Sequence, residues 1–230
     1  MLSLVMVIFV NDKQKDRQKQ LDMIGIIGGT FDPIHFGHLR PALEIMELLS
    51  LEELRFIPSA KPPHRWQPEA GAQHRLKMTD LAIKDVKGFV IDDREYQREG
   101  ASYTVDTLKS IRKEISNERP LCMIIGLDAF QSFTQWHDWK TILTLTHIIV
   151  SPRPGYEITD ADAWAEPYLT QDIAELKQKV SGKIYFAEVT QFEIAATDIR
   201  EKLHNRKNIT YLLPKTVSDY IDKQQLYIKS

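Results

Sequence analysis

Two histidines, His35 and His38, lie three positions apart behind a glycine-rich stretch, in the segment GGTFDPIHFGH at residues 28–38. The reference pKa of an imidazole is close to neutral pH, so both side chains can donate hydrogen bonds and carry partial or full charge. Such donors suit a reaction in which negative charge develops on phosphoryl oxygens. We interpret both histidines as candidate catalytic donors; the plainer alternative is that they only cap or pack a helix.

A short strand and a helix must position these histidines. Residues 23–27 are apolar, which fits a buried parallel strand, and they run into Gly28 and Gly29, whose backbones can adopt dihedral angles closed to other residues. Apolar residues then recur at helical spacing, so a helix is expected to begin near Phe36 or Gly37. Its first turn offers unpaired amides and partial positive charge to a triphosphate, and Gly37 leaves room for the approach. The sequence predicts a phosphate-binding corner.

Several function classes are disfavoured. The segment lacks the G-x-G-x-x-G of dinucleotide-binding folds and the G-K-[ST] of P-loops, which argues against hydride transfer and P-loop ATP hydrolysis. The formal net charge of −2 gives no basic excess to attract a polyanion, so no nucleic-acid partner is expected.

The 230 residues are expected to form an N-terminal extension, 1–22, and a single domain, 23–230. Residues 2–10 are largely apolar but too short to span a bilayer, and no basic segment precedes them as in a signal peptide. The only cysteine, Cys122, lies in an apolar run and is interpreted as a buried residue. We therefore expect a cytoplasmic protein without a membrane partner.

Strand and helix patterns alternate along most of the chain. Further strands are predicted at 55–58, 89–92, 121–125, 147–150 and 183–189, with helices at 73–86 and 105–115. Leu76, Leu81, Ala82 and Ile83 are expected to face inward. An acidic, partly helical insertion is expected at about 155–180, and closing helices near 198–203 and 215–225, within a C-terminal helical part at about 197–226. The alternation predicts an α/β fold with a doubly wound, mostly parallel sheet that binds ligands at the carboxyl ends of its strands.

Two segments could complete a nucleotide site. Gly126 and Asp128 follow the strongest apolar strand, where a carboxylate can accept from a ribose hydroxyl or a base amine, although Asp is also a common helix cap. Near the C-terminus, Thr197 or Asp198 is the expected helix cap, and Arg200 in the first turn could meet phosphate oxygens in a fork. The alternative for Arg200 is a surface residue on a plain capped helix.

Two further segments could contact a second substrate. Lys61 lies in AKPPHR at 60–65, a loop stiffened by paired prolines, which is equally compatible with an ordinary surface loop. Trp136 could stack on a heteroaromatic ring or fill the core. Neither segment alone identifies the substrate.

Taken together, the chain resembles the nucleotidyltransferase superfamily that carries an H-x-G-H signature, and most closely the bacterial nicotinate mononucleotide adenylyltransferases. The resemblance covers residues 23 to about 227. It rests on GGTFDPIHFGH at 28–38, KPPHR at 61–65, SYT at 102–104, IIGLD at 124–128, Trp136, SPRPG at 151–155, AATDIR at 195–200, and LP at 213–214.

This resemblance implies a Rossmann-like nucleotidyltransferase fold with C-terminal helices and a step of NAD biosynthesis. ATP and nicotinate mononucleotide would give deamido-NAD (nicotinate adenine dinucleotide) and pyrophosphate by direct in-line attack, with Mg²⁺ bound through the ATP phosphates and no metal ligand from the protein. The implied catalytic residues are His35 and His38. The implied ATP-binding residues are Gly28, Gly29, Thr30, Gly126, Asp128, Thr197 and Arg200, and those for the mononucleotide are Lys61, Thr104, Trp136 and Arg153.

Two positions depart from the family pattern. Ala195 and Ala196 stand where members often carry serine before the closing arginine, so hydroxyl donation falls to Thr197 or to backbone amides, and His137 replaces a frequent tyrosine. Three rival functions stay open: a pantetheine-phosphate adenylyltransferase, a cytidylyltransferase and a non-catalytic nucleotide sensor. The sequence also leaves open the choice between acid and amide mononucleotide, and a homo-oligomeric state.

Overall fold

A six-stranded sheet forms the centre of the computed structural model, which describes residues 22–63, 67–152, 156 and 159–228. The strands are β1 (Ile24–Gly29), β2 (Glu53–Pro58), β3 (Phe89–Ile91), β4 (Leu121–Gly126), β5 (His147–Ser151) and β6 (Ile184–Phe186). They lie in the order β3-β2-β1-β4-β5-β6, and every neighbouring pair is parallel. The predicted doubly wound sheet is confirmed, and its described strands are all parallel.

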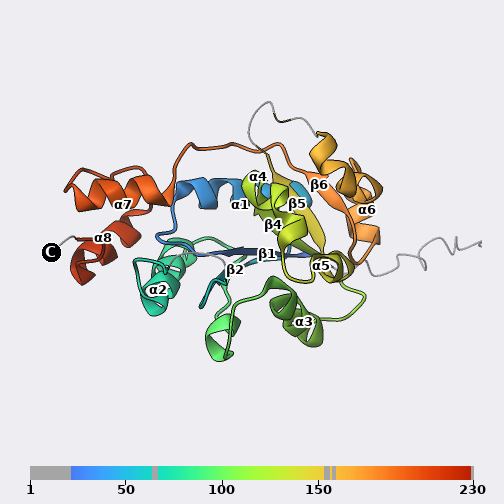
Figure 1. Cartoon of the computed structure of the whole chain (residues 1–230), viewed down its shortest axis with the longest axis horizontal. Helices are drawn as coiled ribbons and strands as arrows, with labels where there is room; N and C mark the ends of the chain where they lie inside the picture. Colours follow the sequence, from blue (N-terminus) through green and yellow to red (C-terminus); the bar gives the residue numbers. More distant parts are fainter. Residues whose placement is uncertain (1–21, 64–66, 153–155, 157–158, 229–230) are drawn as a thin grey trace, which may run out of the picture.

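Helices connect the strands and lie on both sides of the sheet (Figure 1). The α-helices are α1 (Phe36–Leu49), α2 (Ala72–Ile83), α3 (Thr104–Glu114), α4 (Leu127–Gln131), α5 (Trp139–Leu145), α6 (Ile173–Gln178), α7 (Ala196–His204) and α8 (Lys215–Gln224). The 3₁₀ helices of the described residues are η1 (Arg94–Gln97), η2 (Phe133–Gln135) and η3 (Asp160–Tyr168). The start of α1 at Phe36 and the presence of two closing helices agree with the sequence prediction, although α7 begins before the expected residue 198.

Both faces of the sheet are buried. In β4, Leu121, Met123 and Ile125 pack into one core cluster with α3, α4 and α5, whereas Cys122 and Ile124 pack into another with α1, α2 and α6. Figure 1 shows α1 and α3 on opposite sides of the sheet. A parallel strand covered on both faces must be apolar at successive positions, which explains why 121–125 gave the strongest strand pattern.

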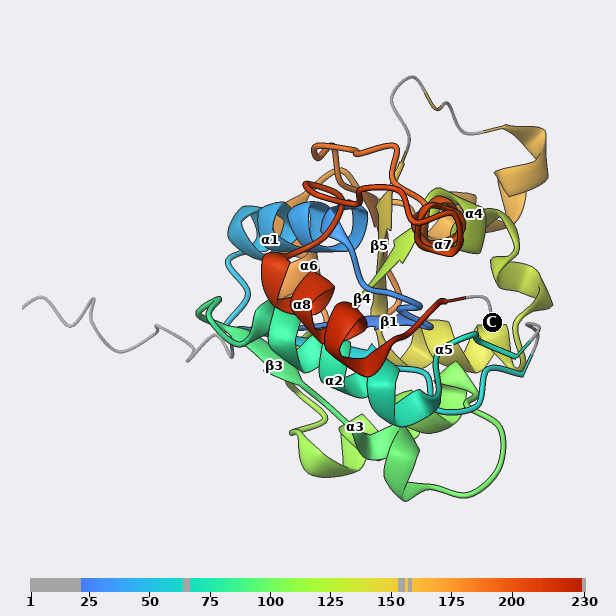
Figure 2. The same cartoon turned by 90° about the vertical axis from the view of Figure 1, so that its left-hand side faces the viewer.

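The carboxyl ends of β1 and β4 lie side by side, and the helices that follow them, α1 and α4, pack into opposite core clusters. This is the topological switch point at which doubly wound folds bind ligands. Figure 2 looks onto this end of the sheet and shows α7 and α8 in front of it. The segment between these two helices contacts α1 directly, because the Phe36 N–H donates to the Leu212 carbonyl at 3.1 Å.

Two local predictions need correction. The first strand continues through Gly28 and Gly29, which pair with β2, so the turn begins only after them. In α2, Ile83 is buried and Ala82 packs against the core, as predicted, whereas Leu76 and Leu81 are only partly buried and the other buried side chains are those of Arg75, Met78 and Thr79. The buried face includes Arg75 because its guanidinium donates to backbone carbonyls inside the protein, and α8 packs along α2, with Thr216 Oγ1 donating to the Leu81 carbonyl at 3.0 Å.

The acidic stretch at 155–180 is partly helical, with η3 and α6 in it. Trp164 of η3 stacks on Phe133, with ring centroids 5.5 Å apart, which anchors the stretch to η2. Residues 1–21, which include the expected apolar patch, lie outside the described residues. In the part of the chain that the structure describes, no helix is both long and apolar enough to cross a membrane.

Candidate active site

The two histidines lie together at the N-terminus of α1. His35 immediately precedes the helix and His38 is its third residue, and their ring centroids are 3.8 Å apart. The His35 backbone N–H donates to Nδ1 of His38 at 3.3 Å. Because Nδ1 of His38 accepts this bond, the neutral ring carries its proton on Nε2, which is therefore the nitrogen that can donate.

The His35 side chain is almost entirely buried, with 4% of its surface exposed. Its Nδ1 is buried and has no hydrogen-bond partner among the described residues. Burial lowers the pKa of His35 to about 4, because an imidazolium loses its hydration there. We expected His35 to carry partial or full charge near neutral pH. In the protein without substrate, its imidazole is instead neutral at that pH.

The absence of a side chain at Gly37 makes room for the His35 ring. A Cβ at this position would lie 2.9 Å from both Cε1 and Nδ1 of His35 and 3.1 Å from the Ile194 carbonyl oxygen. Any larger residue would displace the imidazole. The prediction that Gly37 makes room for an anion therefore left out its contact with His35. The first turn is also partly paired, because the amide of Phe36 donates to the Leu212 carbonyl and that of His38 to the His35 carbonyl.

Asp32 ties three distant segments together, and sequence reasoning missed it. Its Oδ1 accepts from the Ala70 amide at 3.1 Å and from the Tyr227 hydroxyl at 2.7 Å, and its Oδ2 accepts from the Glu69 amide at 2.9 Å. The carboxylate thus joins the histidine segment to the loop before α2 and to the residues after α8. Its place inside the glycine–histidine segment was the available signal, but its partners are far away in the sequence.

Arg75 is the second residue that was missed. Its side chain is 1% exposed, and its guanidinium donates to four backbone carbonyls. The acceptors are Thr30 (2.8 Å) and Ser59 (2.6 Å) for Nη1, Ala60 (3.3 Å) for Nη2 and Ala70 (3.2 Å) for Nε. The arginine therefore fixes the chain just after β1 and β2, at the carboxyl ends of these strands.

The beginning of α7 brings Thr197 and Arg200 to the histidine segment. The residue before the helix is Ala195, not Thr197 or Asp198, since Ala195 is extended and its carbonyl accepts from the Ile199 amide at 3.2 Å. Arg200 Nη1 donates to the Asp32 carbonyl at 2.8 Å, and its Nη2 lies 3.4 Å from Thr197 Oγ1. Both predicted residues therefore lie in one connected group with the loop that precedes His35.

The residues expected to hold a second substrate form another group. The Lys61 amide donates to Ser102 Oγ at 3.1 Å, and the Ser102 amide donates to the Lys61 carbonyl at 3.0 Å, which places Lys61 beside the start of α3. Thr104 is the first residue of α3 and is half-buried. The preceding Tyr103 packs against His137, the neighbour of Trp136, with ring centroids 4.5 Å apart.

Trp136 itself has a mixed environment. It packs on Phe133, with ring centroids 5.4 Å apart, and it is partly exposed. One part of the indole therefore belongs to the core, and another part reaches the surface. This geometry is compatible with both interpretations of Trp136 drawn from the sequence.

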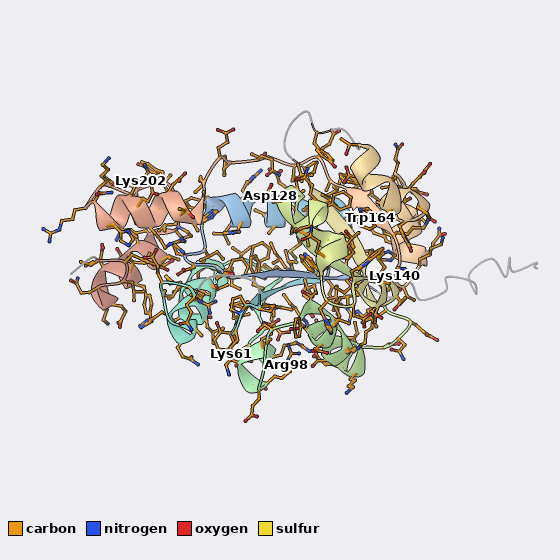
Figure 3. All side chains as sticks on the ribbon, viewed as in Figure 1. Lys61, Arg98, Asp128, Lys140, Trp164 and Lys202 are labelled. Carbon is orange, nitrogen blue, oxygen red and sulfur yellow. The ribbon has the colours of Figure 1, made fainter. Side chains whose placement is uncertain are left out.

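The glycines at the strand ends differ in their surroundings. A Cβ on Gly29 would lie 2.8 Å from the Phe31 ring, whereas no atom lies within 4 Å of a Cβ built on Gly126. Gly126 therefore borders open space at the end of β4, and Asp128, two residues further on, is exposed. In the view of Figure 3, Asp128 lies above β1 and Lys61 lies below it.

Arg153, predicted to contact the mononucleotide, lies outside the described residues, as do His64 and Arg65 of the KPPHR loop. The described part of the chain has no cluster of three or more His, Cys, Asp or Glu side chains that could hold a metal ion.

The comparisons with known proteins agree with this geometry. A family model described as cytidylyltransferase-like matches residues 26–202. A solved structure of Plasmodium falciparum nicotinic acid mononucleotide adenylyltransferase complexed with NaAD shares the fold, with a TM-score of 0.69 at 19% identity over 90% of this chain and 97% of that one. The fold, the paired histidines and the family match define a nucleotidyltransferase of the cytidylyltransferase-like family.

Two curated relatives narrow the family. A Methylococcus capsulatus protein named "Probable nicotinate-nucleotide adenylyltransferase" is 49% identical over 211 residues, covering 90% of this chain and 100% of that protein. A Yersinia pestis protein of the same name is 42% identical over 209 residues, covering 89% and 95%. The chain belongs to the nicotinate-nucleotide adenylyltransferase family, which confirms the resemblance drawn from its motifs.

The burial of His35 predicts a loss of stability in mild acid. Because the pKa of His35 is about 4 in the folded protein and near 6.5 in an unfolded chain, the unfolded chain binds the proton first as the pH falls. Stability is therefore complete above about pH 6.5 and decreases down to about pH 4, with His35 contributing a loss of about 2 kcal/mol between pH 8 and pH 5. Urea unfolding of wild type and His35→Gln at both pH values measures this, and equal losses in the two proteins would contradict it.

Proposed function

We propose that this chain transfers the adenylyl group of ATP to nicotinate mononucleotide, giving nicotinate adenine dinucleotide and pyrophosphate, a step of NAD biosynthesis. Family membership supports the reaction, and the observation that carries it is the position of His38 at the N-terminus of α1, where the bond from the His35 amide to Nδ1 leaves Nε2 as the donating nitrogen. A donor at a helix N-terminus suits a phosphate, because the partial positive charge of the helix end also attracts the anion.

The proposed chemistry is a direct displacement. A phosphate oxygen of the mononucleotide attacks the α-phosphorus of ATP in line; one P–O bond forms, the bond to pyrophosphate breaks, and no covalent enzyme intermediate is needed. His38 donates from Nε2 to a phosphoryl oxygen on which charge develops, and His35 holds a second position on the phosphates. Catalysis then consists of positioning and charge stabilisation by groups that are already oriented.

The other residues bind the two substrates. For ATP we assign Gly28, Gly29 and Thr30 at the end of β1, Gly126 and Asp128 to the adenosine, and Thr197 and Arg200 to the β- and γ-phosphates. Open space beside Gly126 and the contact between Arg200 and the Asp32 loop support these assignments. For the mononucleotide we assign Lys61, Thr104, Trp136 and Arg153, with the indole stacking on the pyridine ring.

Mg²⁺ enters the proposal through ATP. This cation is usually held by substrate phosphates and waters rather than by an all-protein cage, and the donors near the histidines suit phosphate oxygens rather than the metal itself. The ion would neutralise charge on the triphosphate, while the histidines and Arg200 orient its oxygens. We also propose a cytoplasmic location, which the lone, buried Cys122 supports. Residues 23–230 are proposed to form a single domain.

The reaction is tested by pyrophosphate release. Purified protein receives ATP and Mg²⁺ with nicotinate mononucleotide, its amide analogue or phosphopantetheine in parallel, and a control without acceptor. We expect fast release with the acid form, and the adenylylated product is identified by mass. Release with phosphopantetheine alone, or ATP binding without release for any acceptor, would contradict the proposal.

A further inference from the structure

All three nitrogens of the Arg200 guanidinium already have acceptors within the protein. Nη1 donates to the Asp32 carbonyl at 2.8 Å, Nη2 lies 3.4 Å from Thr197 Oγ1, and Nε donates to Glu69 Oε1 at 2.8 Å. These contacts use three of its five N–H groups, and a phosphate that binds in a fork through Nε must displace the Glu69 carboxylate.

The contact with Glu69 is the one that can be exchanged. The Asp32 acceptor is a backbone carbonyl in a loop fixed by three hydrogen bonds to its own carboxylate, whereas the Glu69 side chain is 41% exposed. An exposed ion pair contributes at most about 1 kcal/mol, so a polyphosphate with several negative charges can displace it. The Glu69 carboxylate thus occupies the position of an anion on Arg200.

Displacement needs no movement of the backbone. The Glu69 and Ala70 amides stay bonded to the Asp32 carboxylate, at 2.9 and 3.1 Å, so only the Glu69 side chain must turn away. Its second oxygen, Oε2, lies 2.8 Å from Nε2 of His204, one turn further along α7. Both contacts of this carboxylate are therefore made with the helix that we assign to the phosphates.

We propose that Glu69 is an exchangeable counter-ion of Arg200, competing with the terminal phosphates of ATP on entry and with pyrophosphate on exit. This inference rests on the proposed function, because it assigns Arg200 to those phosphates. Glu69 keeps the guanidinium oriented between turnovers, weakens ATP binding, and favours release of pyrophosphate by re-forming its contact with Nε.

Glu69→Gln tests the exchange, since it removes the charge and keeps the shape and a hydrogen-bond acceptor. Equilibrium titration, without turnover, measures the Kd of ATP and of inorganic pyrophosphate in the presence of Mg²⁺. Charge-assisted hydrogen bonds are about twice as strong as neutral ones, so we expect both Kd values to fall about threefold to fivefold. Weaker binding of either anion would overturn the proposal, because Glu69 would then only hold Arg200 in place.

Two further variants distinguish loss of the ion pair between Glu69 and Arg200 from the general loss of one negative charge near the site. Glu201→Gln removes the same charge from an exposed side chain next to Arg200 on α7, and we expect less than a twofold change. In an Arg200→Gln background, Glu69→Gln should bring no gain in affinity. Equal gains from Glu69→Gln and Glu201→Gln, or a gain that persists without Arg200, would reject the exchange. A wild type that binds neither anion would instead reject the proposed function itself.

Discussion

Replacing His38 by alanine lowers kcat about 10²- to 10³-fold, while the protein remains folded. The magnitude is that of removing one oriented donor to a transition-state oxyanion. His38 is only partly buried, so truncation leaves no large cavity, and what is lost is the Nε2 donor that the His35 amide orients through Nδ1. Steady-state kinetics with ATP and nicotinate mononucleotide measures the loss, and circular dichroism checks the fold.

His38→Asn is the matched control for that experiment. Its side-chain oxygen lies near the place of Nδ1 and can still accept from the His35 amide, but it has no group at the place of Nε2. We therefore expect the asparagine variant to be as slow as the alanine variant. Recovery in His38→Asn would show that the histidine only caps α1, and a near-normal rate in a folded His38→Ala protein would remove it from the reaction altogether.

The parts of the site that the sequence predicted are those defined by neighbours along the chain. The spacing of His35 and His38, the start of α1 at Phe36, and the two-sided burial of 121–125 all follow from local pattern. Periodicity and glycine placement describe such segments because the groups that interact lie within one or two turns of each other. The order of these local motifs along the chain then indicated the family.

The parts that were missed depend on contacts between distant segments. Tyr227 reaches Asp32 across 195 positions, and no periodicity reports such a pair. The start of α7 was misplaced because the Ala195 backbone, without a side-chain cap, begins the helix. Gly37 was assigned to the ligand alone, since nothing in the sequence shows that the His35 ring folds back over it. Arg75 was overlooked because arginine on an amphipathic helix is normally exposed.

Removing Arg75 should destabilise the protein by about 3 to 5 kcal/mol, because Arg75→Met leaves four carbonyl acceptors without their shared donor. Methionine fills much of the volume, so the loss comes from the unpaired Thr30, Ser59, Ala60 and Ala70 carbonyls rather than from a cavity. Lysine offers one ammonium in place of a planar fork, and Arg75→Lys should therefore recover only part of the stability.

Urea unfolding of Arg75→Met, Arg75→Lys and Arg40→Met measures this effect against a matched control. Arg40 is an exposed arginine on α1 that pairs with Glu44, so its loss should cost about 0.5 kcal/mol or less. A loss below about 1 kcal/mol for Arg75→Met would mean that water replaces the guanidinium. The expected large loss would instead show that the chain stabilises its substrate-binding loops with a buried charge, since Arg75 fixes both the segment before His35 and the one that contains Lys61.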